Sequence, residues 1–413
     1  MYRKISNTAF LFQISIPTFS RFTSYRIIFL LFSLRVTCKR TRRQLGSFHK
    51  IDLNTFFSFS IVCCIFSVMS LLAVEYYIGK NRYDAMEHDK MINRRSFLRT
   101  VSVCSGVFFF QPFVFGSNES RTILRFGLIA DVHQDVMHDS PQRIKAFKKA
   151  MNKSKADFVC QLGDFCQPRE RNKEFIAQWN QFKRPHYHVI GNHEMDGGYT
   201  REQVVAFFGM PDRYYSFDKK GVHVIVLDGN DPGGESEGYN RYISETQLSW
   251  IKENLRNTSL PTIIFSHQAL DDTAGIENCD DVRKILEEAR TSTGQKKVVA
   301  CFCGHHHDDQ AKEINGIHYI RINSASYAWL GSQFQHESYS GDIHQKFPWI
   351  SYTAPYKEPL WAFIEMDLAK GRLIVKGKAT SWVGPTPWEL GVDKKTKDPN
   401  VCAPRISDRT LSI

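Results

Sequence analysis

Outside its first 120 residues the sequence has almost no net charge. Residues 1–120 hold 16 Lys and Arg against 6 Asp and Glu, whereas the remaining residues hold 38 against 37, so the formal charge of +11 belongs to the leader. The body also lacks a basic stripe interleaved with aromatic residues, which is the pattern that follows a phosphate backbone. We therefore expect no nucleic-acid partner.

Internal repeats are absent too, and only six of the ten cysteines lie beyond residue 117. The pair Cys301-x-Cys303 lacks the spacing of a closed zinc site. Because Cys160, Cys301 and Cys303 lie in apolar runs, we expect buried thiols, although the sequence leaves disulfide pairing open.

The leader holds two apolar segments. The uncharged run Thr55–Val74 is about long enough to cross a bilayer. Residues 91–117 are similar to a twin-arginine export signal, with Arg94-Arg95 ahead of an apolar stretch. We therefore interpret residues 1–90 as an upstream extension or, alternatively, as a membrane anchor that contacts lipid. Both interpretations predict a body that works outside the cytoplasm, in the periplasm or cell envelope.

The body alternates short apolar runs with amphipathic helical stretches, which predicts an α/β domain. We assign the domain to residues 118–385, a long aromatic connection to residues 325–360 within it, and a C-terminal tail to residues 386–413. The expected strands are Thr122–Ala130, Asp157–Leu162, His186–Ile190, Val222–Leu227, Thr262–Phe265, Lys297–Cys303, Ile317–Ile322, Trp361–Met366 and Leu373–Lys376.

Five of these runs end in polar groups able to bind a metal or act on a proton. In open α/β sheets ligands collect beyond the carboxyl ends of strands, so we expect the groups to converge. Each alone is more typical of a turn, cap or surface loop, but five in succession are very unlikely by chance. The segments are Asp131-Val132-His133, Gly163-Asp164, Gly191-Asn192-His193-Glu194, Ser266-His267 and Gly304-His305-His306-His307.

Carboxylate, amide and imidazole groups in this combination suit a site for two divalent ions. In an extended chain, residues two apart point to the same side. That spacing predicts that His305 and His307 face the site while His306 turns away, and it pairs Asp131 with His133.

Together these motifs resemble the full set of the calcineurin-like metallophosphoesterases, over roughly Arg125 to Ile322. The resemblance implies a four-layer αββα sandwich, in which helices flank two mixed β-sheets, and two metal ions (Fe, Mn or Zn) at one edge. It implies that Asp131, His133 and His307 hold the first ion. Asn192, His267 and His305 would hold the second, and Asp164 would bridge the two.

The resemblance also implies hydrolysis of a small-molecule phosphate ester by a hydroxide that the two metals activate. His193 would stabilise the transition state or protonate the leaving group. Glu194 either orients a ligand or His193, or is simply a solvated carboxylate.

One difference between this sequence and a branch of the family narrows the choice of branch. Purple acid phosphatases have glycine and tyrosine where this sequence has His133 and Gln167, which argues against a tyrosinate-bound ferric ion. The pattern is closer to a bacterial, exported, phosphodiesterase-like branch. Phosphodiesters are therefore favoured over phosphomonoesters, and a non-catalytic phospho-ligand-binding domain and a mononuclear hydrolase remain alternatives.

Several further residues are weaker candidates for substrate contact, and the predicted site does not include them. Packing within loops, or plain exposure, is the more usual role for such residues. They are His138, Tyr239, Arg241, Tyr327, Trp329, Trp349 and Tyr352.

Overall fold

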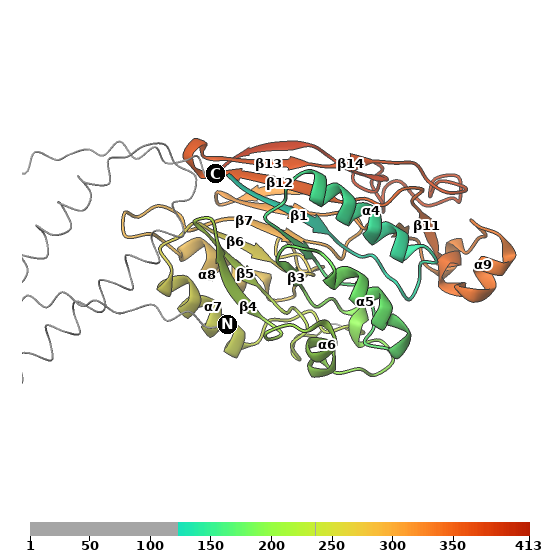
Figure 1. Cartoon of the computed structure of the whole chain (residues 1–413), viewed down its shortest axis with the longest axis horizontal. Helices are drawn as coiled ribbons and strands as arrows, with labels where there is room; N and C mark the ends of the chain where they lie inside the picture. The colour runs from blue at the N-terminus through green and yellow to red at the C-terminus, as the bar shows by residue number, and fades with distance from the viewer. Residues whose placement is uncertain (1–122, 236) are drawn as a thin grey trace, which may run out of the picture. The chain divides into compact units, whose positions relative to one another are not determined.

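The computed structural model describes residues 123–413 apart from residue 236 (Figure 1). The run Thr55–Val74 and the pair Arg94-Arg95 therefore lie outside the described residues. Within the described part, no helix combines the length and the apolar character that a bilayer crossing requires.

Two six-stranded mixed sheets form the centre of the domain. In the first, β1 is parallel to β2, which is parallel to β3, while β12, β13 and β16 continue antiparallel. Its order is β16 (Arg409–Ser412), β13 (Arg372–Lys376), β12 (Ala362–Asp367), β1 (Ile123–Ile129), β2 (Phe158–Gln161) and β3 (His186–His188).

The second sheet has four parallel strands and an antiparallel strand at each edge. Its order is β4 (Tyr215–Lys219), β5 (Val222–Val226), β6 (Thr262–Phe265), β7 (Val298–Cys303), β9 (Ile317–Arg321) and β8 (Ala311–Ile314). Sequence analysis missed both edge strands, because neither has a run of buried residues.

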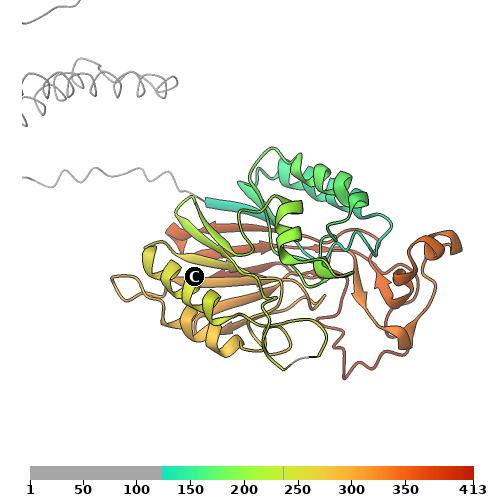
Figure 2. The same cartoon turned by 90° about the horizontal axis from the view of Figure 1, so that it is seen from below.

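Helices cover the outer face of each sheet (Figure 2). On the first lie α4 (Ser140–Lys153) and α5 (Lys173–Asn180), and on the second lie α7 (Glu245–Asn257) and α8 (Cys279–Glu288). The predicted four-layer α/β fold is thus confirmed. Further helices are α6 (Arg201–Phe208), α9 (Gly341–Lys346) and five 3-10 turns: Glu170–Asn172, His193–Met195, Ser332–Phe334, Pro348–Tyr352 and Leu368–Lys370.

Aromatic side chains fill the space between the sheets. The ring of Phe126 on β1 lies 4.9 Å from that of Phe158, and 5.8 Å from both Phe265 and Phe302 on the second sheet. Burial of one such side chain contributes about 1.5–3 kcal/mol. This cluster fixes the two sheets against each other, and with them the strand ends that carry the polar motifs.

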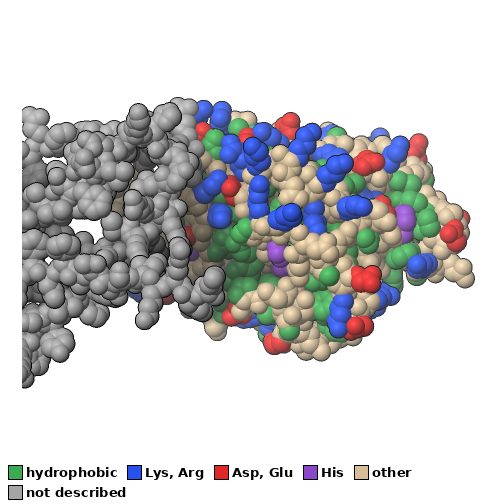
Figure 3. All heavy atoms as spheres, viewed as in Figure 1, with side chains coloured by type: hydrophobic (Ala, Val, Ile, Leu, Met, Phe, Trp, Pro, Cys, Tyr) green, Lys and Arg blue, Asp and Glu red, His purple; other side chains and the backbone are tan. Residues whose placement is uncertain are grey.

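On the outer side, α4 packs Ile144, Phe147 and Met151 against the first sheet. Its opposite face exposes Lys145, Lys149 and Lys153. Lys and Arg side chains gather on this part of the surface in Figure 3, which is viewed as in Figure 1.

The C-terminal segments differ from the predicted division. Residues 386–413 are no separate tail, because β16 pairs with β13 and β15 (Arg405–Ile406) pairs with β14 (Lys378–Ala379). The predicted loop 325–360 contains α9 and a small antiparallel ladder of β10 (Tyr327–Trp329) with β11 (Thr353–Pro355). Strands this short leave too little periodicity to be read from sequence.

All six cysteines beyond residue 117 are free and buried in the structure, as expected for the three in apolar runs.

Candidate metal centre

All seven predicted ligands follow strands whose carboxyl ends lie at one edge of the two sheets. Asp131 and His133 follow β1, Asp164 follows β2, and Asn192 follows β3. His267 follows β6, and His305 and His307 follow β7. Parallel pairing within each sheet aligns these ends, and the packed sheets bring the two rows together.

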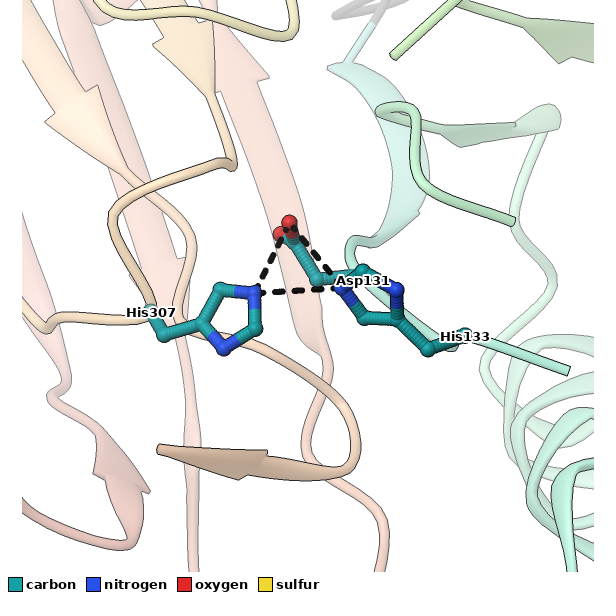
Figure 4. A group of neighbouring side chains, drawn as sticks. All are labelled: Asp131, His133 and His307. Atoms are coloured by element: carbon teal, nitrogen blue, oxygen red, sulfur yellow. Dashed lines mark hydrogen bonds and ion pairs between the residues drawn. The ribbon is translucent and has the colours of Figure 1, made fainter. Parts of the chain in front are cut away.

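Asp131, His133 and His307 form one group (Figure 4). His307 Nε2 lies 3.2 Å from Asp131 Oδ1 and 3.3 Å from His133 Nε2, and His133 Nε2 lies 4.0 Å from Asp131 Oδ1. All three side chains are buried. Their ligand atoms face one another around a common point.

Asp164, His267 and His305 form a second group. His267 Nε2 lies 3.2 Å from both Asp164 Oδ2 and His305 Nδ1, and 3.1 Å from the amide oxygen of Asn192. Asn192 therefore joins this group as its fourth donor.

Asp164 Oδ2 lies between the two groups, 3.2 Å from His267 Nε2 and 3.7 Å from His133 Nε2. Atoms bound about 2.1 Å from one ion lie roughly 3.0–3.4 Å apart in octahedral or tetrahedral geometry. Most donor–donor distances in both groups fall near this range. The donors therefore fit two neighbouring ions that share one carboxylate.

The tautomers of the histidines support the same fit. His267 Nδ1 faces the carbonyl oxygen of Leu162 at 2.8 Å, and His307 Nδ1 faces that of Tyr327 at 2.9 Å. A carbonyl only accepts, so both Nδ1 atoms carry hydrogen, and in neutral rings both Nε2 atoms present lone pairs to the site.

The charges at the second group call for a cation. Burial disfavours the charged form of His267, but the Asp164 carboxylate outweighs burial and raises the pKa of His267 to about 10. The surroundings of Nε2 of His267, between Asp164 and Asn192, therefore favour a bound positive charge, either a proton or a metal ion. By contrast, burial lowers the pKa of His133 and of His305 well below the usual value, which leaves both as neutral donors.

The backbone at the ligands is not extended, and the reasoning from an extended chain was wrong in this respect. Asp131, His133 and Asp164 have φ of 52°, 51° and 51°, and His305 and His307 have φ of 68° and 51°. Left-handed residues at both ends of each X-x-X motif still direct the outer side chains to the site. His306 points elsewhere, with Nε2 3.7 Å from Asp272 Oδ1.

The glycines of the motifs allow backbone to approach the ligands closely. A Cβ at Gly191 would stand 2.2 Å from Asp164 Oδ1, and one at Gly304 would stand 2.4 Å from Asp131 Oδ2. Any larger residue at either position would push a carboxylate out of place.

Glu194 is fully buried, so it is not a solvated carboxylate. Its Oε1 accepts from Phe165 N at 2.6 Å, and its Oε2 accepts from the backbone N–H of Asp164 and Gly191 at 3.2 and 2.8 Å. Burial, together with the charge of Asp164, raises the pKa of Glu194 to about 8. Glu194 thus positions the backbone of Asp164 rather than His193.

His193 lies beside the ligands with its ring half exposed. Its Nδ1 is 2.7 Å from Asp196 Oδ2 and 3.1 Å from Tyr239 Oη. Burial opposes the charged form, but Asp164 and Asp196 outweigh it and raise the pKa of His193 to about 9. Asp196 was not among the residues predicted from sequence; it directly follows the 3-10 turn His193–Met195 as its C-cap.

The sequence favours a packing role for Tyr327, yet in the structure Tyr327 contacts the first group directly. Its ring lies 5.0 Å from the rings of both His133 and His307, and its carbonyl accepts from His307. It therefore fixes the orientation of two candidate ligands.

A cavity of about 740 Å³ opens onto these residues. His133, Asp164, His193, His305 and His307 line it from the candidate metal centre. Its other lining residues include Arg169, Arg171, Tyr239, Tyr327, Trp329, Lys346, Trp349 and Lys397. The space accommodates a substrate considerably larger than one phosphate group.

Comparisons with known proteins agree with the family resemblance of the motifs. Residues 124–309 match the model of the calcineurin-like phosphoesterase family. The chain is 23% identical over 283 residues to an Arabidopsis thaliana protein named manganese-dependent ADP-ribose/CDP-alcohol diphosphatase, covering 51% of this chain and 88% of the relative.

Two solved structures are also similar. A dimetal phosphatase from Danio rerio has a TM-score of 0.46 and 17% identity, covering 63% of this chain and 98% of that one. GAP50 of Plasmodium has a TM-score of 0.43 and 14% identity, covering 71% and 89%. Residues 124–309 therefore form a metallophosphoesterase domain of the calcineurin-like phosphoesterase family.

Proposed function

We propose that the domain hydrolyses diester linkages of phosphate or diphosphate with the help of two divalent ions. Asp131, His133 and His307 would hold one ion. Asn192, His267 and His305 would hold the other, with Asp164 shared. Two such ions supply polarisation of the phosphoryl oxygens and a lowered pKa for water.

The position of Asp164 Oδ2 carries the proposal. It lies within 3.7 Å of an imidazole nitrogen from each group, and it is buried. A mononuclear hydrolase has no use for a carboxylate placed between two sets of donors.

The chain's own contribution to proton transfer centres on His193. Asp196 accepts from Nδ1 of the charged ring, so Nε2–H is free to donate toward the leaving oxygen. Because the Asp196 contact is independent of the ligand groups, it persists when cations offset the charge of Asp164. Asp196 thus acts as a positioning residue for His193.

Two observations favour a diester over a monoester. The cavity of about 740 Å³ exceeds what a terminal phosphate needs, and two substituents on the phosphate require such room. The Arabidopsis relative is named for the diphosphate esters ADP-ribose and CDP-alcohols and for manganese. These names make Mn²⁺ the first ion to test and ADP-ribose the first substrate.

The test is metal content together with a substrate panel. Purified protein loaded with Mn²⁺ is expected to hold about two ions per chain and to lose activity on complete chelation. It should cleave ADP-ribose and bis(4-nitrophenyl) phosphate faster than 4-nitrophenyl phosphate. One ion per chain at full activity, or undiminished activity after chelation, would overturn the proposal, and a faster monoester reaction would overturn the diester preference.

We also propose export through the segment 91–117, on the strength of Arg94-Arg95 and the apolar stretch that follows. Fractionation of cells that express the chain from Met91 should place the protein outside the cytoplasm. The double change Arg94→Lys and Arg95→Lys should retain it inside, and an unchanged distribution would contradict the proposal.

A further inference from the structure

Large hydrophobic side chains that remain exposed are concentrated at one place in the described domain. They are Tyr239, Trp329 and Trp349, with 43%, 42% and 54% of their surface exposed. All three line the cavity that opens onto the candidate metal centre. An exposed apolar surface inside a cavity is typical of ligand binding rather than of packing.

These rings belong to a continuous row that starts at a candidate ligand. From His133 the row passes to Tyr327 at 5.0 Å and on to Trp329 at 6.4 Å. It continues from Trp329 to Tyr352 at 5.9 Å, with planes only 9° apart, and from Tyr352 to Trp349 at 5.2 Å. We call Tyr327, Trp329, Tyr352 and Trp349 the aromatic wall.

Backbone contacts hold the aromatic wall in place. Trp329 pairs with Thr353 in the β10–β11 ladder, and Leu330 N donates to the carbonyl oxygen of Tyr352 at 2.9 Å. From the C-terminal segment, Lys397 Nζ donates to the carbonyl oxygen of Trp329 at 2.6 Å. The rings are thus preorganised before any ligand arrives.

Cations without carboxylate partners accompany the wall. Arg169, Lys346 and Lys397 line the same cavity, and none of them forms an ion pair within the described residues. Arg171, by contrast, is paired with Asp135 at 2.8 Å. Aspartates line the cavity as well, but Asp135 pairs with Arg171, Asp196 pairs with His193, and Asp164 lies in the candidate metal centre. The three cations therefore favour a ligand that carries more negative charge than one diester supplies.

We propose that the aromatic wall binds the base of a nucleoside diphosphate ester, while the unpaired cations bind its diphosphate. This inference rests on the proposed function for the metal end of the cavity. A planar base and a diphosphate are the two features that such a wall and such cations recognise together. Stacking on one aromatic ring is worth about 1–3 kcal/mol per base, which is about 5–150-fold in affinity.

The kinetic test compares two substrates that share a diphosphate, of which only ADP-ribose carries a base and sugars. For Trp349→Ala, the kcat/KM of ADP-ribose relative to dimethyl diphosphate is expected to fall about 5–100-fold, mainly through KM. Trp349→Phe should recover most of that ratio, because it keeps a ring. The ring of Trp250 packs against that of Tyr214 at 4.8 Å with the planes tilted, and Trp250 lines no part of this cavity. Trp250→Ala should therefore leave the ratio unchanged.

A binding test avoids turnover altogether. AMP added to chelated protein is expected to quench the fluorescence of the aromatic wall, and Trp349→Ala should remove most of this quenching. If the unaltered protein cleaves neither substrate, the proposed function fails. If it cleaves both and Trp349→Ala changes neither the substrate ratio nor the quenching, the aromatic wall does not bind the base while the proposed function stands.

Discussion

The two ends of the cavity are built in opposite ways. The candidate metal centre consists of side chains at the ends of five strands, all buried except the partly exposed His305, and sheet pairing sets the position of each strand end. The aromatic wall consists of rings on one short strand, β10, and on a 3-10 turn, and Trp329 and Trp349 are partly exposed. Lys397 of the C-terminal segment donates a hydrogen bond to it. The first end needs fixed distances for its chemistry, whereas the second needs only surface and charge.

Substitutions at the two ends should therefore have different effects. A substitution at the metal centre should alter ion binding and kcat, whereas one at the aromatic wall should alter KM and substrate choice. Four substitutions test this separation between effects on ion binding and kcat and effects on KM and substrate choice.

The largest effect is expected for Asp164→Asn. Loss of the shared carboxylate charge removes several kcal/mol of ion and transition-state stabilisation, which corresponds to about a 10³-fold fall in kcat. Bound Mn²⁺ should fall from about two ions per chain toward one, as measured by elemental analysis. Retention of both ions with normal kcat would place the bridging role elsewhere.

A smaller loss is expected for His193→Gln, which removes the proton donor but no ligand. We expect kcat for ADP-ribose to fall about 10²–10³-fold with metal content unchanged. With a 4-nitrophenyl leaving group, which needs little protonation, the fall should be much smaller. Asp196→Asn should cost about tenfold, and an equal loss for both leaving groups would contradict the acid role.

Gly304→Ala should weaken ion binding without removing any ligand. Its Cβ would stand 2.4 Å from Asp131 Oδ2 and 2.9 Å from Ala130 Cβ, so Asp131 must move. We expect the apparent affinity for Mn²⁺ to fall about 10–100-fold, with partial recovery at high Mn²⁺ in a titration. Gly341→Ala, where a Cβ meets nothing within 4 Å, is the matched control.

The smallest effect concerns the acid stability of the glycine-rich loop 229–241, which carries Tyr239. Asp231 at the start of this loop lies 2.7 Å from Arg201 and 2.6 Å from Arg213. Burial opposes ionisation, but hydrogen bonds from Arg201, Ser244 and Gln247 lower the pKa of Asp231 to about 2. The stabilisation is therefore full above about pH 5 and is lost as the pH falls toward 2.

Urea unfolding at a series of pH values measures this contribution of Asp231 to the free energy of unfolding. The difference in unfolding free energy between the unaltered protein and Asp231→Asn should shrink as the pH drops from 5 to 2. A difference that stays constant over this interval would show that the ion pairs contribute nothing that depends on the charge of Asp231.

The sequence indicates which residues come together in the candidate metal centre better than it indicates the cavity around them. The ligand residues can be recognised in the sequence because each follows an apolar run. Parallel pairing of the strands then brings the strand ends together independently of the loop conformations. Asp196 carries no such signal, since one aspartate after a 3-10 turn is ordinary. Lys397 lies far along the chain in a segment without periodicity, and only the folded structure places it beside Trp329.

The same limit applies to the fold. Strands with continuous apolar runs, such as β1 and β7, are readable because both faces are buried. Strand β16 is not, because it lies at a sheet edge and alternates partly buried with exposed residues. Its place beside β13 depends on a long-range pairing that no local pattern encodes.

Five of the seven candidate ligands stand at positive φ without being glycine. Left-handed backbone costs roughly 1–2 kcal/mol per residue, somewhat less for aspartate. Replacing Asp131 or His307 by glycine would thus relax the main chain while deleting a donor. Directed evolution for heat resistance alone should accumulate such replacements and yield stable but inactive proteins. In this chain, stability and catalysis place opposite demands on the same five positions.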